Sequence, residues 1–297
     1  MIPLVSTLCQ GPLGVAQLPR LWWKNLLHQA GQLDEDYPFC SGGLDKYVLE
    51  VLRIDQDSAL RFLWDQRPSY LQFEEWVTAE GTYESNRIAR WNESLVQRAH
   101  YMPAKIDETY GDIGWSLEEA TEVSAVLLNC LQDWHLFHRR VFARVLTPDA
   151  PGLSGPVAPT LSSIDRGPLG ICQLPRTWLK TCLRAKGWLH RDYPDCAEGS
   201  LDQRCLQTLQ VDQDAALIFL RQTLPTYLDF EAWVRRQGTI EGEAVAAFNQ
   251  RLLEREHNAA KQAEIHATLQ RPPTWTSGVL LNHLEDWHYA HQGLVGG

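Results

Sequence analysis

The sequence predicts an all-α protein made of two homologous helical domains of about six helices each, related by approximate two-fold pseudo-symmetry. Three observations support this prediction. The second half of the chain repeats the first, and helix-start signals stand at matching places in both copies. No Val/Ile/Thr-rich alternation or Asn-Gly hairpin indicates a sheet. The 297 residues are enough for two domains that each bury a core.

The repeat extends over most of the chain. The segment GPLGVAQLPRLWWK that begins at Gly11 returns as GPLGICQLPRTWLK at Gly167, and about half of the positions in the two copies are identical. The correspondence ends in LNCLQDWHLFH and LNHLEDWHYAH. Between the copies, residues 147–163 are rich in Pro, Gly and Ser, which is typical of a linker. We therefore predict a first repeat at 1–146, a linker at 147–166 and a second repeat at 167–297.

Each predicted helix has a local reason. Leu-Pro-Arg opens a helix with proline in its first turn, where the missing N–H does no harm. Asp55 and Asp212 place a capping carboxylate before SALRFLW and AALIFLR. SYLQFEEWV and TYLDFEAWV then show helical spacing. Longer helical segments complete the copies, at 84–100 and 116–142 in the first and at 241–270 and 276–295 in the second.

Composition limits the kinds of partner that we expect. A net charge of −10 without any basic run argues against nucleic acid, whose binding depends on clustered Lys and Arg. No apolar stretch is long enough to span a membrane, and no export signal is visible. Seven cysteines without a C-x-x-C pair favour reduced thiols. We expect a cytoplasmic monomer or homodimer with a small-molecule ligand.

Several of the repeated residues carry a family resemblance. Leu-Pro-Arg, Tyr-Pro-x-Cys, Leu-Asp-x-x-x-Leu, an Ile/Val-Asp loop and x-Trp-Val follow in the same order in both copies. This order resembles the bacterial DUF5069 family over about the first two thirds of each copy. Members of that family are single-copy helical domains of unassigned function. The resemblance therefore implies a helical fold for each copy. The Asp-Trp-His-x-x-His ending lies outside the resemblance.

Three histidines coincide when the two copies are aligned. The pairs are His100 with His257, His135 with His288, and His138 with His291. Residues three apart on a helix lie on one face, so the two histidines of each Asp-Trp-His-x-x-His segment can face a common object. We predict His135, His138, His288 and His291 as catalytic residues.

The sequence leaves three roles open for these histidines. Together with His100 or His257 they could hold zinc or iron, with Glu254 and Glu285 as further ligands in the second copy. Without a metal, a histidine pair can act as general acid and base near neutral pH. A structural role is also open, because the helix dipole favours histidine at a helix C-terminus.

The remaining candidates would bind a ligand. They are Trp134, Trp287, Asp133, Asp286, Arg20 and Arg176. Each arginine could clamp an anion or pair with Asp36 or Asp192. The predicted function is a small-molecule enzyme of the lyase, cyclase, isomerase or metal-dependent type, acting on an apolar or aromatic substrate. The alternative is a non-catalytic ligand-binding or protein-interaction scaffold.

Overall fold

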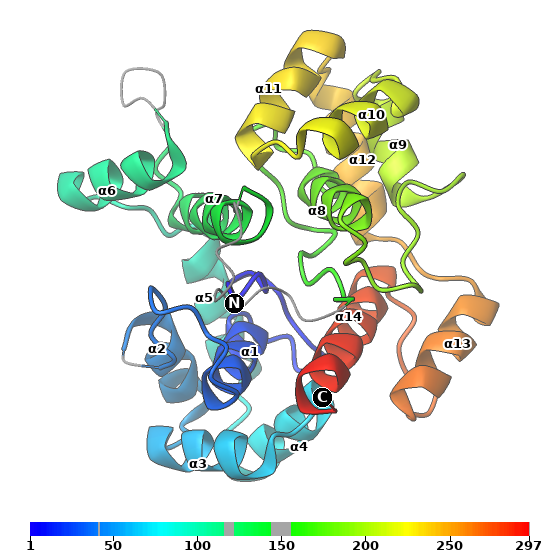
Figure 1. Cartoon of the computed structure of the whole chain (residues 1–297). Coiled ribbons are helices and arrows are strands. Elements are labelled where there is room, and N and C mark those ends of the chain that lie inside the picture. Colours follow the sequence, from blue (N-terminus) through cyan, green and yellow to red (C-terminus); the bar gives the residue numbers. More distant parts are fainter. Residues whose placement is uncertain (41, 116–121, 144–155, 297) are drawn as a thin grey trace.

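The computed structural model describes residues 1–40, 42–115, 122–143 and 156–296. Within these ranges all regular secondary structure is helical (Figure 1). The first copy contains α1 (Leu18–Gln29), α2 (Gly43–Leu52), α3 (Gln56–Gln66), α4 (Tyr70–Glu80), α5 (Ser85–Val96), α6 (Pro103–Ile113), α7 (Ala125–Phe137) and a π-helical turn η1 (His138–Phe142). The second contains α8 (Leu174–Ala185), α9 (Leu201–Thr208), α10 (Gln213–Thr223), α11 (Tyr227–Gln237), α12 (Gly242–Leu253), α13 (Ala259–Leu269) and α14 (Gly278–Val295). No described helix combines the length and the apolar character needed to cross a bilayer.

The helix starts predicted from Leu-Pro-Arg and from the capping aspartates are confirmed. Residues 116–121 of the predicted helix 116–142 lie outside the described residues, and α7 begins at Ala125. Proline lies in the first turn of both α1 and α8. Asp55 accepts a hydrogen bond from the backbone N–H of Ser58, and Asp212 accepts one from Ala215. Ser69 adds a capping box at the start of α4. Each of these side chains satisfies a backbone N–H that the helix itself leaves unpaired.

Two predicted boundaries were wrong. The stretch 101–115, which separates the predicted helices 84–100 and 116–142, contains α6. This helix has Pro103 in its first turn and ends at the left-handed Gly114. The predicted helix 241–270 is two helices, because the Asn258 side chain caps a new start for α13. Each copy therefore has seven described α-helices rather than six.

Part of the predicted linker is buried structure. Residues 144–155 lie outside the described residues, but the segment from Pro156 to Arg166 is largely buried. Leu161 is fully buried and Ser162 is 1% exposed. This segment corresponds in sequence to the buried start of the first copy, APTLSS matching IPLVST. The sequence correspondence between the copies thus begins before Gly167.

The last two helices of each copy pack into the core of the other copy. Apolar side chains of α6 and α7 share one hydrophobic core with α8 to α12, whereas α13 and α14 share another with α1 to α5. Trp134 of α7 lies edge-on to Tyr227 at 4.7 Å between ring centroids, and Trp287 of α14 meets Tyr70 in the same way at 4.5 Å. α14 packs beside α4, as Figure 1 shows, and α7 packs against α11.

The same helices stay bonded to their own copy through ion pairs. Asp133 of α7 binds Arg20 of α1 at 2.7 Å, and Asp286 of α14 binds Arg176 of α8 at 2.7 Å. Each of these helices therefore turns its aspartate toward its own copy and its tryptophan toward the other. This double attachment joins the two copies through buried surface on both sides.

Candidate functional site

His138 and His291 bind backbone carbonyls of the opposite copy. The Nε2 atom of His138 lies 2.8 Å from the carbonyl oxygen of Leu224, and that of His291 lies 2.8 Å from the carbonyl oxygen of Arg67. Leu224 and Arg67 are the left-handed residues that end α10 and α3. Carbonyls at a helix C-terminus lack a partner within the helix. These imidazoles supply one, which is a structural role.

His100 and His257 are held where their copies turn from the fifth helix to the sixth. The N–H of His100 donates to the carbonyl of Val123, and that of His257 donates to the carbonyl of Thr276. The ring of His257 bonds the Asn282 side chain at 2.8 Å. Burial lowers the pKa of both imidazoles.

The predicted metal sites do not assemble among the described residues. No three His, Cys, Asp or Glu side chains there are grouped as metal ligands would be. His138 and His291 are directed to carbonyls of the other copy. Glu285 pairs with Lys261 at 3.1 Å, and Glu254 accepts a hydrogen bond from Gln250. Imidazoles and carboxylates that were predicted to meet are thus held by other partners.

His135 and His288, unlike His138 and His291, do not cap a helix of the opposite copy, and both are partly buried. Burial is the largest cause of the lowered pKa of each ring. His288 lines a groove of about 400 Å³ between α4, α13 and α14, together with Gln72, Arg271 and His291. The neutral imidazole is therefore the favoured form of His288 at pH 7.

The predicted ligand-binding residues are parts of buried contacts. Arg20 donates to Asp133 and to the carbonyls of Pro3 and Val5, and Tyr37 donates to Asp133 at 2.6 Å. Arg176 makes the equivalent bonds to Asp286, Pro159 and Leu161. The predicted pairs with Asp36 and Asp192 were wrong, because the carboxylate partners of the arginines come from α7 and α14. The anion clamp stays a prediction. Trp134 and Trp287 are at most 2% exposed and pack between the copies.

The sequence reasoning missed a pair of buried glutamates. Glu74 accepts hydrogen bonds from the Tyr70 hydroxyl at 2.6 Å and from the backbone N–H of Leu13. Burial raises the pKa of Glu74 to about 7, and Glu231 in the second copy has the same environment and a pKa of about 7. A Cβ atom at Gly11 would lie 2.2 Å from the Tyr70 ring. The repeated GPLG and Tyr-Leu-x-Phe-Glu motifs were the available signal.

A second missed contact lies where the two copies meet. His283 bonds the Ser162 hydroxyl through Nε2, and its Nδ1 lies 3.3 Å from the carbonyl oxygen of Gln10. The ring is 3% exposed and stacks on Trp287. Burial lowers the pKa of His283 to about 4, so the imidazole stays neutral at pH 7. No motif indicated this contact, because the first copy has Cys130 at the equivalent position.

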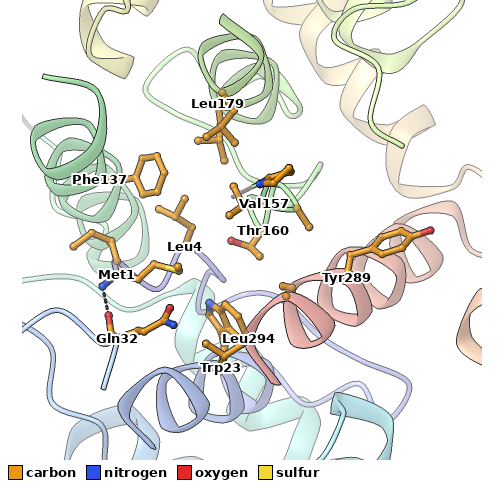
Figure 2. Close-up of a pocket in the computed structure, with 16 residues that line it drawn as sticks. Met1, Leu4, Trp23, Gln32, Phe137, Val157, Thr160, Leu179, Tyr289 and Leu294 are labelled. Carbon is orange, nitrogen blue, oxygen red and sulfur yellow. Dashed lines mark hydrogen bonds between the residues drawn. The ribbon is translucent and has the colours of Figure 1, made fainter. Parts of the chain in front are cut away.

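An apolar pocket lies between the copies (Figure 2). Its free volume is about 100 Å³. Figure 2 shows side chains that reach it from α1, α7, α8 and α14 and from the segments that precede α1 and α8. The polar side chains in its wall include the Thr160 hydroxyl and the Gln32 amide. Its other lining residues are Met1, Ile2, Leu4, Trp23, Phe137, Pro156, Val157, Ala158, Leu179, Leu183, Tyr289, Ala290, Gly293 and Leu294.

Equivalent positions of the two copies contribute to this pocket. Ile2 corresponds to Ala158, Leu4 to Thr160, Trp23 to Leu179 and Phe137 to Ala290, and all eight residues line it. The first copy supplies the larger side chain in each pair. The duplication therefore creates the pocket, and the differences between the copies make its two sides chemically unequal.

Comparisons of the chain with protein-family models, with curated proteins and with solved structures gave no match. The resemblance to the DUF5069 family stays a prediction. The case for a function rests on the geometry of the pocket and grooves.

Proposed function

We propose that the protein binds a small, largely apolar molecule in the pocket between its two copies. The observation that carries this proposal is the lining of mainly apolar side chains contributed by both copies, with a few polar groups among them (Figure 2). A cavity of roughly 150 Å³ lined by apolar side chains stays dry and binds benzene. The free volume here, about 100 Å³, is of the same order. A single aromatic ring or a short aliphatic chain is the ligand of matching size.

Approximate two-fold symmetry between the copies is part of the proposal. This symmetry would place the pocket on the two-fold axis between the copies. A ligand there would contact positions that are aligned in the two copies but carry different side chains. Trp23 and Phe137 offer aromatic surface on one side, whereas Thr160 offers a hydroxyl on the other. A ligand with an apolar ring and one hydroxyl or carbonyl would be oriented by this difference. The buried, unpaired thiols of all seven cysteines support a cytoplasmic location for such a protein.

Ligand-observed NMR with toluene, benzyl alcohol and indole tests the proposal. In the variant Ala290→Phe, the first copy's residue at this position would fill the pocket, so binding should weaken at least tenfold while the protein stays folded. Ala260→Phe, on the exposed surface of α13, is the control and should bind as the wild type does. The proposal fails if none of the three probes binds the wild type, or if Ala290→Phe binds them equally well.

A second candidate is an acid–base enzyme of the lyase or isomerase type, and one observation favours it. The groove that contains His288 shares Leu71 and Arg271 with a groove of about 270 Å³ whose wall includes Glu74. A carboxyl group with a pKa of about 7 is suited to proton transfer near neutral pH. Turnover that is lost in His288→Ala and kept in Ala290→Phe would support this candidate, and turnover with the opposite dependence would reject it.

A further inference from the structure

Three arginines line one groove on the second copy. The groove lies between α9 and α12 and has a volume of about 580 Å³. Arg204, Arg251 and Arg255 line it, together with Gln207 and the apolar side chains of Leu201, Phe248 and Leu252. We infer that this groove is an anion site for a small organic phosphate, separate from the apolar pocket between the copies.

The charge of these arginines is not balanced by ion pairs. None of the salt bridges among the described residues includes Arg204, Arg251 or Arg255. Two glutamates at the ends of α12 bond to amides instead: Glu241 accepts from Gln210 at 3.3 Å, and Glu254 accepts from Gln250 at 2.9 Å. Burial, and then the Arg204 cation, lower the pKa of Arg255. In a chain of net charge −10, this is a local concentration of positive charge.

The fold does not require this concentration of charge. In the first copy, Tyr47, Glu50 and Ser94 take the positions of Arg204, Gln207 and Arg251. The same helices form there, and Glu50 pairs with Lys46 at 3.7 Å. Only Arg255 has an arginine as its counterpart, Arg98. The cationic groove is therefore a property of the second copy alone. The fold does not need Arg204 or Arg251 for packing, whereas Arg255 also bonds the His257 ring at 3.3 Å.

The composition of the groove indicates the class of ligand. A guanidinium group presents paired N–H donors that match two oxygens of a phosphate, and several such groups suit a dianion better than a single carboxylate. The wall of Leu201, Phe248 and Leu252 gives an organic group an apolar surface. A volume of about 580 Å³ lies within the usual range for small-molecule sites. A phosphate monoester with an aromatic or aliphatic body fits both features.

Isothermal titration calorimetry with phenyl phosphate, inorganic phosphate and benzoate tests this inference. Phenyl phosphate should bind the wild type more tightly than either of the other two, because only phenyl phosphate combines the dianion with the ring. Arg251→Ser and Arg204→Tyr install the residues of the first copy, so the fold should tolerate them. Each should weaken phenyl phosphate binding about tenfold or more, the loss expected for a charge-assisted contact.

Two controls separate this site from other effects. Arg98→Gln removes one positive charge from the first copy and should leave binding unchanged, whereas an equal loss would mean that only net charge matters. Ala290→Phe should also leave phenyl phosphate binding unchanged, so failure of the apolar pocket proposal would not affect this one. The inference is overturned if phenyl phosphate does not bind at millimolar concentration or if Arg251→Ser binds it as the wild type does.

Discussion

Replacing Glu74 with glutamine should change how the stability of the protein depends on pH. Glu74 is buried, and its carboxyl group accepts hydrogen bonds from Tyr70 and Leu13. Burial raises the pKa of Glu74 from its ordinary value of 4.5 to about 7 in the folded protein. Glutamine keeps the shape and an acceptor oxygen but cannot ionise.

The sign and the size of the effect follow from proton linkage. Between pH 4.5 and pH 7 the unfolded chain loses the proton of Glu74 while the folded protein keeps it. The raised pKa therefore contributes stability that is complete below pH 4.5 and is lost as the pH rises through 7. The difference between the two pKa values corresponds to about 3 kcal/mol. The glutamine variant should gain that amount relative to the wild type between pH 4.5 and pH 7.5.

Urea unfolding of both proteins across this pH range measures the difference directly. Glu231→Gln should reproduce the result, because Glu231 has the equivalent environment in the second copy and a pKa of about 7. Glu80→Gln, at the exposed end of α4, is the control and should give a difference that does not change with pH. A flat difference for both Glu74→Gln and Glu231→Gln would refute the reasoning.

Three further substitutions test the contacts between helices. Asp286→Asn should lower the free energy of unfolding by about 3–5 kcal/mol, because Arg176 would stay buried without its charged partner; a loss below about 1 kcal/mol in urea unfolding would contradict this. His138→Ala should cost about 1 kcal/mol in the same assay, since the Leu224 carbonyl loses a hydrogen bond, and no change would argue against a capping role. His283 has a pKa of about 4 in the folded protein against an ordinary 6.5, so stability should fall by about 3 kcal/mol as the pH drops from 6.5 to 4. His283→Gln should remove that part of the pH dependence, and an unchanged stability curve would contradict the assignment.

The features predicted correctly from sequence are those fixed by local chemistry. Proline in the first turn of α1 and the capping carboxylate of Asp55 specify helix starts whatever the chain does later. The omission of α6 also has a local cause, because Pro103 and Gly114 are signals for a helix start and a helix end that the prediction did not use. The metal site predicted for the three histidines does not assemble among the described residues, for a different reason. Spacing places His135 and His138 on one helix, but it does not specify what each ring meets.

The exchange of helices between the copies could not be predicted from the repeat. Tyr70 and Tyr227 stand in the same repeated motif, so the sequence does not indicate which of them Trp134 contacts. Packing complementarity alone leaves that choice open. The ion pairs do not decide it, since Asp133 binds Arg20 within its own copy. The exchange of helices does determine which residues line the pocket between the copies. Phe137 and Ala290 occupy the same position when the two copies are aligned. The exchange brings both of these different side chains to one pocket. Aligning the two copies therefore draws attention to the histidines that they share. The structure instead draws attention to the positions at which the copies differ and contact each other.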